Sequence, residues 1–233
     1  MFRKKNWINY YSSEILNLKH YTNSLHLLFP SVITVGSFDG VHLGHQALLQ
    51  QVTFYAKQKN CQSVLITFDP HPQQALQTQP DFFLINTLEQ KITLFEKLGI
   101  DTVVVIPFSK TLSQKSAVAF FEEYILTKIN VKTVFMGPNH HFGKQREGNA
   151  DTLSQLCATK GIEIITTQEY KVNETQVRST LIRKYLAKND FQNAEKLMGH
   201  NFYIKNKVDK CLEDFFPSHH SQAHVPPQIY WEY

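Results

Sequence analysis

Two histidines stand three residues apart in a glycine-rich segment that runs from Gly36 to His45 and reads GSFDGVHLGH. A run of β-branched residues precedes this segment and a helical period follows it, so the segment joins a strand to a helix. We expect the helix to begin between His42 and Gly44, where its free N–H groups and its dipole would bind phosphate. The first helical turn would place His42 and His45 on one face. The spacing therefore predicts a site for a nucleotide polyphosphate, and a glycine-rich turn with two surface histidines is the alternative.

A second segment with phosphate-binding side chains runs from Val177 to Arg183 and opens another expected helix. Ser179 or Thr180 is a suitable N-cap for that helix. Arg183 follows these residues by four and three positions, so all three side chains can face one ligand. Hydroxyl groups, a helix N-terminus and a guanidinium group together bind phosphate well. An ordinary capped amphipathic helix is the alternative, and the glycine–histidine segment makes it the weaker interpretation.

Two further loops follow expected strands. Thr67–Pro72 contains two prolines that stiffen it, and its Phe68 or His71 could contact a flat ring, while a rigid connector is the alternative. The loop over residues 137–149 is long, basic and punctuated by glycine, which is typical of binding loops and mobile lids. Its Asn139 offers a donor and an acceptor, which suits the edge of a heterocycle. The two adjacent histidines after it have no third metal ligand nearby, so we predict no metal site there.

Strands and helices that alternate along the chain would bring these loops together. Short apolar runs rich in β-branched residues predict buried strands over Val32–Val35, Val64–Phe68, Val103–Ile106, Thr133–Met136 and Glu163–Thr167. Helical periodicity predicts helices over Gln46–Lys57, Leu88–Leu98, Ala117–Ile129, Thr152–Thr159 and Thr180–Ala187. The alternation indicates βαβ units and an α/β fold with a doubly wound parallel sheet. Ligands of such sheets bind beyond the carboxyl ends of the strands.

Composition narrows the possible partners. The 233 residues include 24 Lys and Arg and 20 Asp and Glu, which gives a net charge of +4. That mild positive charge fits an anionic ligand, and we expect neither a nucleic acid nor a membrane as partner. The three cysteines lie far apart, which argues against a disulfide framework or a cysteine zinc site and favours a reducing compartment. The basic start of the chain lacks the apolar core of a secretory signal, so the expected location is cytoplasmic.

The pattern of strands and helices degrades after Gly199. We therefore expect one domain over residues 1–200 and a short tail over residues 201–233. Phe202–Val208 is a candidate strand within that tail.

Four of these segments resemble, in order and with matching gaps, the motifs of the bacterial FAD synthetases, which are bifunctional riboflavin kinase/FMN adenylyltransferases. The glycine–histidine segment resembles the G-x-F-D-G-x-H-x-G-H signature, a variant of the nucleotidyltransferase H-x-G-H motif, and Thr67–Pro72 resembles T-F-x-P-H-P. Met136–Asn149 resembles the family's glycine-rich aromatic and basic loop, and Val177–Arg183 resembles I-S-S-T-x-I-R. Asp190–Gly199 resembles the helix and L-G step that follow. The resemblance covers residues 31–204.

The resemblance implies a Rossmann-like nucleotidyltransferase fold that joins FMN to the AMP portion of ATP, with Mg²⁺, and gives FAD and pyrophosphate. It implies that ATP is held by Gly36, Ser37, Phe38, Asp39, Gly40, His42, Gly44, His45, Ser179, Thr180 and Arg183. It implies catalytic roles for His42, His45 and Arg183. It implies that the flavin is held by Phe68, Pro70, His71, Asn139 and Phe142. The FMN phosphate is already anionic near neutral pH, so the reaction needs positioning and charge stabilisation rather than a strong base.

Three features depart from the family's pattern. Arg178 replaces the first serine of the S-S-T motif and adds a cation. Asn139-His140-His141 stands where an acid or Asn, an aromatic residue and a basic residue are usual. The G-F-P-T-A-N signature of the riboflavin kinase barrel is absent, and the sequence after Gly199 is too short for a barrel of on the order of 60–100 residues. We therefore expect no kinase activity, and we interpret residues 226–233 as at most a remnant of a barrel strand.

Two other functions stay open at this point. The same fold could transfer a nucleotidyl group to another phosphorylated acceptor, or the chain could be a flavin- or nucleotide-binding regulatory module with little turnover. His42 and His45 favour an enzyme, whereas Arg178 and the short tail favour the regulatory module. Binding without pyrophosphate release would support the regulatory module. The sequence does not define the oligomeric state.

Overall fold

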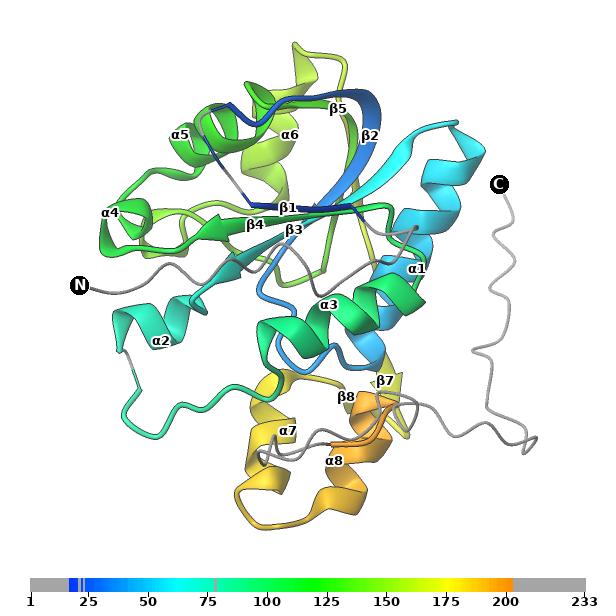
Figure 1. Cartoon of the computed structure of the whole chain (residues 1–233), viewed down its shortest axis with the longest axis vertical. Helices are drawn as coiled ribbons and strands as arrows, with labels where there is room; N and C mark the ends of the chain where they lie inside the picture. The colour runs from blue at the N-terminus through cyan, green and yellow to red at the C-terminus, as the bar shows by residue number, and fades with distance from the viewer. Residues whose placement is uncertain (1–16, 21, 23, 78, 203–233) are drawn as a thin grey trace.

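The computed structural model describes residues 17–20, 22, 24–77 and 79–202. Six parallel strands form one sheet in the order β1-β4-β3-β2-β5-β6 (Figure 1). These strands are β1 (Asn17–His20), β2 (Leu27–Val35), β3 (Gln62–Asp69), β4 (Thr102–Pro107), β5 (Ile129–Met136) and β6 (Glu163–Thr166). The interior strands are the buried β-branched runs of the sequence, as expected for a parallel sheet that is covered on both faces.

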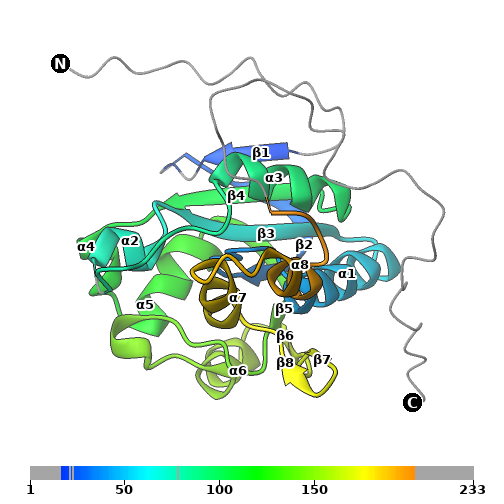
Figure 2. The ribbon, with the colours of Figure 1, turned by 90° about the horizontal axis from the view of Figure 1, so that it is seen from below.

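Helices cover both faces of the sheet (Figure 2). The helices and helical turns are α1 (Leu43–Gln58), α2 (Pro72–Leu76), α3 (Leu88–Lys97), α4 (Lys110–Ser113), α5 (Ala117–Phe121), η1 (Glu122–Leu126, a π-helical turn), η2 (Lys144–Arg146, a 3-10 turn), α6 (Ala150–Ala158), α7 (Ser179–Leu186) and α8 (Phe191–Met198). Successive residues of a strand point to opposite faces. Val32 packs with α1 and α3, whereas its neighbour Ile33 packs with α5 and α6. The predicted doubly wound parallel sheet is confirmed.

A third packed unit lies beside the sheet, formed by α7 and α8 (Figure 1). Ile182 of α7 and Met198 of α8 are fully buried in it. Ile85, from the segment that precedes α3, joins the same cluster and ties the unit to the main body. A short antiparallel hairpin, β7 (Lys171–Val172) and β8 (Thr175–Gln176), leads from the sheet into α7.

All five predicted strands are confirmed, and one predicted helix is wrong at its end. Instead of a helix over Ala117–Ile129, the helical path stops with η1 and Ile129 begins β5. Ile125 and Ile129 are spaced as a helix requires, but Ile129 pairs with Leu27 of β2 and is buried in the sheet. The edge strand β1 was not predicted, because an edge strand can form without the apolar run that marks an interior strand.

The predicted tail over residues 201–233 lies outside the described residues except for Asn201 and Phe202, and so does most of the candidate strand over Phe202–Val208. Within the described part of the chain, no helix has the length and apolar composition that a membrane span requires.

Candidate active site

The loop after β2 leads directly into α1, and His42 caps this helix. The Nδ1 atom of His42 accepts a hydrogen bond from the N–H of His45 at 3.2 Å. The helix begins at Leu43, inside the predicted interval. The imidazole rings of His42 and His45 stack with centroids 3.6 Å apart and planes 12° apart. The prediction that the two histidines share one face is therefore confirmed.

Both imidazoles are neutral near pH 7. Burial lowers the pKa of His42 to about 4. Burial is also the main reason that the pKa of His45 lies well below its usual 6.5, with further lowering from His42 and Lys91. The Nδ1 atom of His45 is buried and has no hydrogen-bond partner among the described residues. A neutral imidazole can donate or accept, and a polyphosphate bound beside it would raise its pKa.

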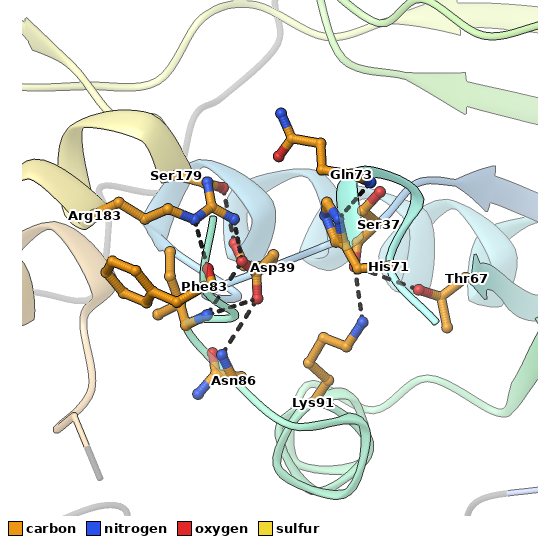
Figure 3. A network of polar contacts seen from close by, with 11 residues as sticks. Ser37, Asp39, Thr67, His71, Gln73, Phe83, Asn86, Lys91, Ser179 and Arg183 are labelled. Carbon is orange, nitrogen blue, oxygen red and sulfur yellow. Dashed lines mark hydrogen bonds and ion pairs between the residues drawn. The ribbon is translucent and has the colours of Figure 1, made fainter. Parts of the chain in front are cut away.

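Asp39 is the centre of a polar network that joins the glycine–histidine loop to α7 and to the segment before α3 (Figure 3). Its carboxylate is 3% exposed and accepts hydrogen bonds from the backbone N–H groups of Ile85 at 3.1 Å and Asn86 at 3.2 Å. The same carboxylate forms an ion pair with Arg183. The backbone carbonyl of Asp39 accepts a hydrogen bond from the Ser179 hydroxyl at 2.8 Å. The two segments predicted from sequence to bind phosphate therefore lie side by side in one polar network.

Arg183 is held on three sides. Besides its pair with Asp39, its Nε atom donates to the backbone carbonyl of Phe83 at 2.9 Å, and its guanidinium carbon lies 4.5 Å from the centre of the Phe82 ring. The Phe82 ring also stacks with His71, with centroids 4.8 Å apart. Burial lowers the pKa of His71 to about 4, so this ring is also neutral near pH 7. His71, which was predicted to contact the flavin, therefore lies in the same network as Arg183.

Lys91 of α3 lies under the same loop. Its side chain is almost fully buried, with the residue 3% exposed, and its Nζ atom donates to the backbone carbonyl of Ser37 at 3.0 Å (Figure 3). Burial lowers the pKa of Lys91, and the carboxylates of Asp39 and Asp69 oppose that lowering. Lys91 was not among the residues predicted from sequence, although a signal was present. It falls within the stripe formed by Leu88, Ile92 and Phe95, where a charged residue is unexpected.

The end of α8 fixes the other side of the loop. The Nε2 atom of buried His200 lies 2.9 Å from the carbonyl of Gly40. The side-chain amide of Gln46 donates to the carbonyls of Val41 at 2.9 Å and Met198 at 2.7 Å. Neither His200 nor Gln46 was predicted, because their contacts depend on how α8 packs on α1. These contacts make the glycine–histidine loop a rigid part of the fold.

The loop over residues 137–149 is ordered by contacts with the start of α5. Phe142 and Gly148 exchange two backbone hydrogen bonds, at 3.1 and 2.9 Å. The carboxylate of Glu147 accepts from the Ala117 N–H at 2.9 Å. A Cβ atom on Gly148 would lie 2.5 Å from the Cβ atom of Ala117, so the close approach requires glycine. The loop is thus a fixed wall in this structure, although its composition is also typical of mobile lids.

Asn139, at the start of this loop, is linked to Arg178 through the carboxylate of Glu169. Its amide nitrogen donates to Glu169 at 2.6 Å. Glu169 lies 3.9 Å from the guanidinium group of Arg178, the residue that departs from the S-S-T motif. Glu169 was not predicted, because it becomes a partner only when the ends of β5 and β6 meet. A carboxylate only accepts hydrogen bonds, so the amide nitrogen of Asn139 must face Glu169 and its oxygen is presented elsewhere.

One of the remaining residues predicted for the flavin, Phe142, lines an apolar cavity of about 10 Å³, room for about one water. Phe142 and His140 line this cavity together with Phe120 of α5. The ring of Phe68 packs against the same Phe120, with centroids 6.1 Å apart. Pro70 is exposed and follows a cis peptide bond. Phe68 and Phe142 therefore share a neighbour, and their contact with flavin stays a prediction.

The predicted N-cap of α7 is wrong. Arg178, not Ser179 or Thr180, occupies the N-cap position, and its side chain makes no capping hydrogen bond. The Ser179 hydroxyl donates to Asp39 instead, and Thr180 is exposed. The N-terminus of α7 therefore has no side-chain cap, and its first N–H groups can receive an anion.

Comparison with known proteins places relatives of this chain in one family. The model of the FAD synthetase family matches residues 26–181. The bifunctional riboflavin kinase/FMN adenylyltransferase of Buchnera aphidicola subsp. Schizaphis graminum is 34% identical over 180 residues, which are 76% of this chain and 57% of that protein. The protein of the same name from Listeria monocytogenes is 32% identical over 178 residues, with 76% and 56% coverage. The one from Escherichia coli K12 is 30% identical over 177 residues, with 76% and 56% coverage. The chain thus spans little more than half the length of these relatives.

A solved structure shares the fold. The crystal structure of a Streptococcus pneumoniae protein described as a macrolide-efflux protein superposes with a TM-score of 0.70 at 26% identity, covering 79% of this chain and 60% of that one. The family match begins just before β2 and reaches the first turn of α7, so it includes the glycine–histidine segment and Ser179 and ends two residues before Arg183. On this match and these identities, the chain belongs to the FAD synthetase family.

Proposed function

We propose that the chain is an FMN adenylyltransferase, which transfers the AMP group of MgATP to the phosphate of FMN and releases pyrophosphate. One observation carries the proposal beyond family membership. Ser179 and Arg183 are both bound to Asp39, in the same loop that leads to His42 and His45. Two phosphate-binding segments that are 140 residues apart in sequence thus form one site, as the triphosphate of a nucleotide requires.

The chemistry needs two anions to meet in line. An oxygen of the FMN phosphate forms a bond to the α-phosphorus of ATP while the bond from that phosphorus to the bridging oxygen of pyrophosphate breaks. Negative charge grows on the leaving pyrophosphate. The N-terminus of α1, the uncapped N-terminus of α7 and the Arg183 guanidinium would stabilise that charge. His42 and His45 would first contribute N–H donors as neutral imidazoles. Because nearby phosphates raise their pKa, the two rings would then also contribute positive charge.

Mg²⁺ would arrive as part of the substrate MgATP. The described residues contain no group of three His, Cys, Asp or Glu side chains that could hold a metal ion, and the carboxylate of Asp39 is already bound by Arg183 and two N–H groups. Mg²⁺ is often bound mainly by substrate phosphates and water. This arrangement supports a metal carried by ATP rather than by a protein cage.

The flavin would bind on the side of the loop that contains Asn139 and Phe142. The amide oxygen of Asn139, turned away from Glu169, is suited to a ring N–H. Phe68 lies near the end of β3, and Pro70 and His71 follow that strand. We also propose residues 1–200 as the nucleotidyltransferase domain, residues 201–233 as its tail, and a cytoplasmic location.

Product analysis tests the proposed activity. The chain is mixed with MgATP and either FMN or riboflavin, and the flavins are separated by chromatography. The proposal expects FAD from FMN and no FMN from riboflavin. Pyrophosphate release with a different phosphorylated acceptor, but not with FMN, would assign the chain to another nucleotidyl transfer. Tight binding of ATP or FMN without pyrophosphate release would favour a regulatory module.

A further inference from the structure

Lys91 carries a buried ammonium group that the proposed mechanism does not use. Burying an ammonium group is costly unless the site requires its charge or its hydrogen bonds. The nearby carboxylate of Asp39 does not explain it, because Asp39 is already paired with Arg183 and accepts backbone N–H groups. The other nearby carboxylate, Asp69, is exposed at the end of β3. The hydrogen bond of Lys91 goes to the backbone carbonyl of Ser37 at 3.0 Å.

The Ser37 carbonyl accepts this hydrogen bond and a longer one from the Thr67 hydroxyl at 3.4 Å, and the shorter bond from Lys91 is the main constraint on the orientation of one peptide unit. The peptide bond between Ser37 and Phe38 is trans, so the Ser37 carbonyl and the Phe38 N–H point in opposite directions. A carbonyl turned toward Lys91 and α3 therefore turns the Phe38 N–H away from α3. Within the described residues, neither the Phe38 N–H nor the Asp39 N–H donates a hydrogen bond.

The backbone at Phe38 is held in an unfavourable conformation. Its φ is +48°, a left-handed value that costs a non-glycine residue roughly 1–2 kcal/mol. The Phe38 ring is buried, with its centroid 5.8 Å from that of Phe95 and 5.2 Å from that of His45. The ring and the Lys91 contact thus fix this turn from both ends. Strain of this kind persists where the surrounding structure imposes it and often marks a binding loop, and successive free N–H groups in such a turn form an anion-binding concavity.

We propose that Lys91 is a positioning residue of the nucleotide site, whose ammonium holds the Ser37 carbonyl and thereby presents the Phe38 N–H to a phosphate of ATP. This inference rests on the proposed function for the identity of the phosphate. It concerns nucleotide binding alone, so it can be tested without the flavin and without turnover.

The first test compares Lys91→Met with Lys97→Met. Both lysines belong to α3, but Lys97 is exposed, so the pair controls for the same change on the same helix. Methionine keeps most of the side-chain volume and removes the charge and the hydrogen bond. We expect Lys91→Met to weaken MgATP binding, measured by calorimetry without FMN, by about tenfold or more. The MgATP affinity of Lys97→Met should stay within about twofold of that of the unaltered chain. The FMN affinity of Lys91→Met, measured by flavin fluorescence, should also stay within about twofold.

The second test needs no variant and therefore does not depend on how Lys91→Met folds. Amide resonances of the ¹⁵N-labelled chain are followed while MgATP is added. A hydrogen bond from the Phe38 N–H to phosphate should move its proton resonance downfield, and an unmoved Phe38 resonance at saturating MgATP overturns the proposal. A folded Lys91→Met variant with MgATP affinity within twofold of the unaltered chain overturns it as well.

These outcomes separate Lys91 from the proposed function. If the unaltered chain makes no FAD but Lys91→Met loses MgATP affinity, the positioning role of Lys91 is supported and FMN is refuted as the acceptor. If the unaltered chain forms FAD and Lys91→Met keeps its MgATP affinity, the proposed function is supported and the positioning role of Lys91 is refuted. A chain that binds no MgATP refutes both.

Discussion

The guanidinium group of Arg183 and the carboxylate of Asp39 form an ion pair between residues 144 positions apart. The two side chains are 14% and 3% exposed, respectively. Each comes from a segment whose sequence already predicts phosphate binding, and neither segment alone indicates that the other is its partner. The pair fixes α7 against the glycine–histidine loop, so we expect stability and nucleotide binding to depend on the same contact.

Removing Arg183 should therefore destabilise the fold as well as the site. Arg183→Met leaves the buried Asp39 carboxylate without its cation, and breaking such a pair costs about 3–5 kcal/mol. Urea unfolding followed by circular dichroism measures this loss. The double variant Asp39→Asn/Arg183→Met should lose less than the sum of the single changes, because the uncompensated charge is gone. Strict additivity of the two changes would show that the pair contributes no coupling.

Acid should destabilise the protein through its buried histidines. The pKa of His42 is about 4 in the folded chain and about 6.5 when unfolded. Below pH 6.5 the unfolded chain binds a proton that the folded chain excludes, so stability present above pH 6.5 is lost as the pH falls toward 4. For His42 alone the loss is about 3 kcal/mol at pH 4. His71 and His140, whose pKa values are also lowered to about 4, act in the same direction.

The free energy of unfolding, measured in urea at a series of pH values, tests this effect. His42→Asn is the matched variant, because asparagine retains the capping acceptor for α1 but does not titrate. Its loss of stability between pH 6.5 and 4 should be smaller by about 3 kcal/mol. An equal pH dependence in both proteins would show that His42 is not buried as a neutral group.

His45 should matter for turnover more than for folding. Its ring stacks on His42, and its buried Nδ1 atom has no partner among the described residues, so its removal breaks no side-chain hydrogen bond. We expect His45→Ala to lower the rate of FAD formation by about tenfold or more, as loss of a positioned proton or hydrogen-bond donor does. Far-UV circular dichroism should still show a folded chain. His26→Ala, at an exposed position, is the control, and equal rates in both variants would remove His45 from the mechanism.

The sequence predicts most of the fold because its signals are local. The strand at Val32–Val35 and the helix start between His42 and Gly44 follow from a β-branched run and a glycine–histidine spacing, and both are confirmed. The partnership of Asp39 and Arg183 has no local signal, because it exists only after α7 packs beside α1. The N-cap of α7 was mispredicted for the same reason, since tertiary contact with Asp39 uses the Ser179 hydroxyl.

Lys91 left a weak signal in the sequence, and Phe82 left none. Lys91 interrupts an apolar helical stripe, which could have marked it as a buried charge with a role. Phe82 lies in a loop with no period of its own, and its stacking on His71 and Arg183 could not be inferred from spacing. Residues that act through backbone carbonyls, as Lys91 does, belong to no side-chain motif.

The wall formed by residues 137–149 should depend on glycine at one position and tolerate alanine at another. A Cβ atom on Gly148 would lie 2.5 Å from the Cβ atom of Ala117 and 2.9 Å from the Phe142 ring, whereas one on Gly137 meets nothing within 4 Å. Gly148→Ala should therefore displace the loop and raise the KM for FMN by about tenfold, with a smaller change in the KM for ATP. Gly137→Ala is the control. Equal KM values for FMN in the two variants would mean that the loop does not shape the flavin site.

Glu169 should set the orientation of Asn139. Its carboxylate accepts from the Asn139 amide at 2.6 Å, and without it the amide can rotate and present either its nitrogen or its oxygen. We expect Glu169→Ala to raise the KM for FMN by about threefold, the value of one exposed hydrogen bond, and to leave the KM for ATP unchanged. Glu122→Ala is the matched control, because the Glu122 side chain is 46% exposed and forms a comparable ion pair, 3.8 Å from Lys160.

Loss of Arg178 separates the two possible roles of this carboxylate. Arg178 lies 3.9 Å from Glu169, and both side chains are more than one-third exposed, so their attraction contributes about 0–1 kcal/mol. If Glu169 acts by orienting Asn139, then Arg178→Ser should leave the KM for FMN within about twofold of the unaltered chain. If instead the three side chains act as one charged unit, Arg178→Ser will raise this KM as much as Glu169→Ala does. Steady-state assays at saturating MgATP distinguish the two results, because Arg178→Ser retains Glu169 and its hydrogen bond to Asn139.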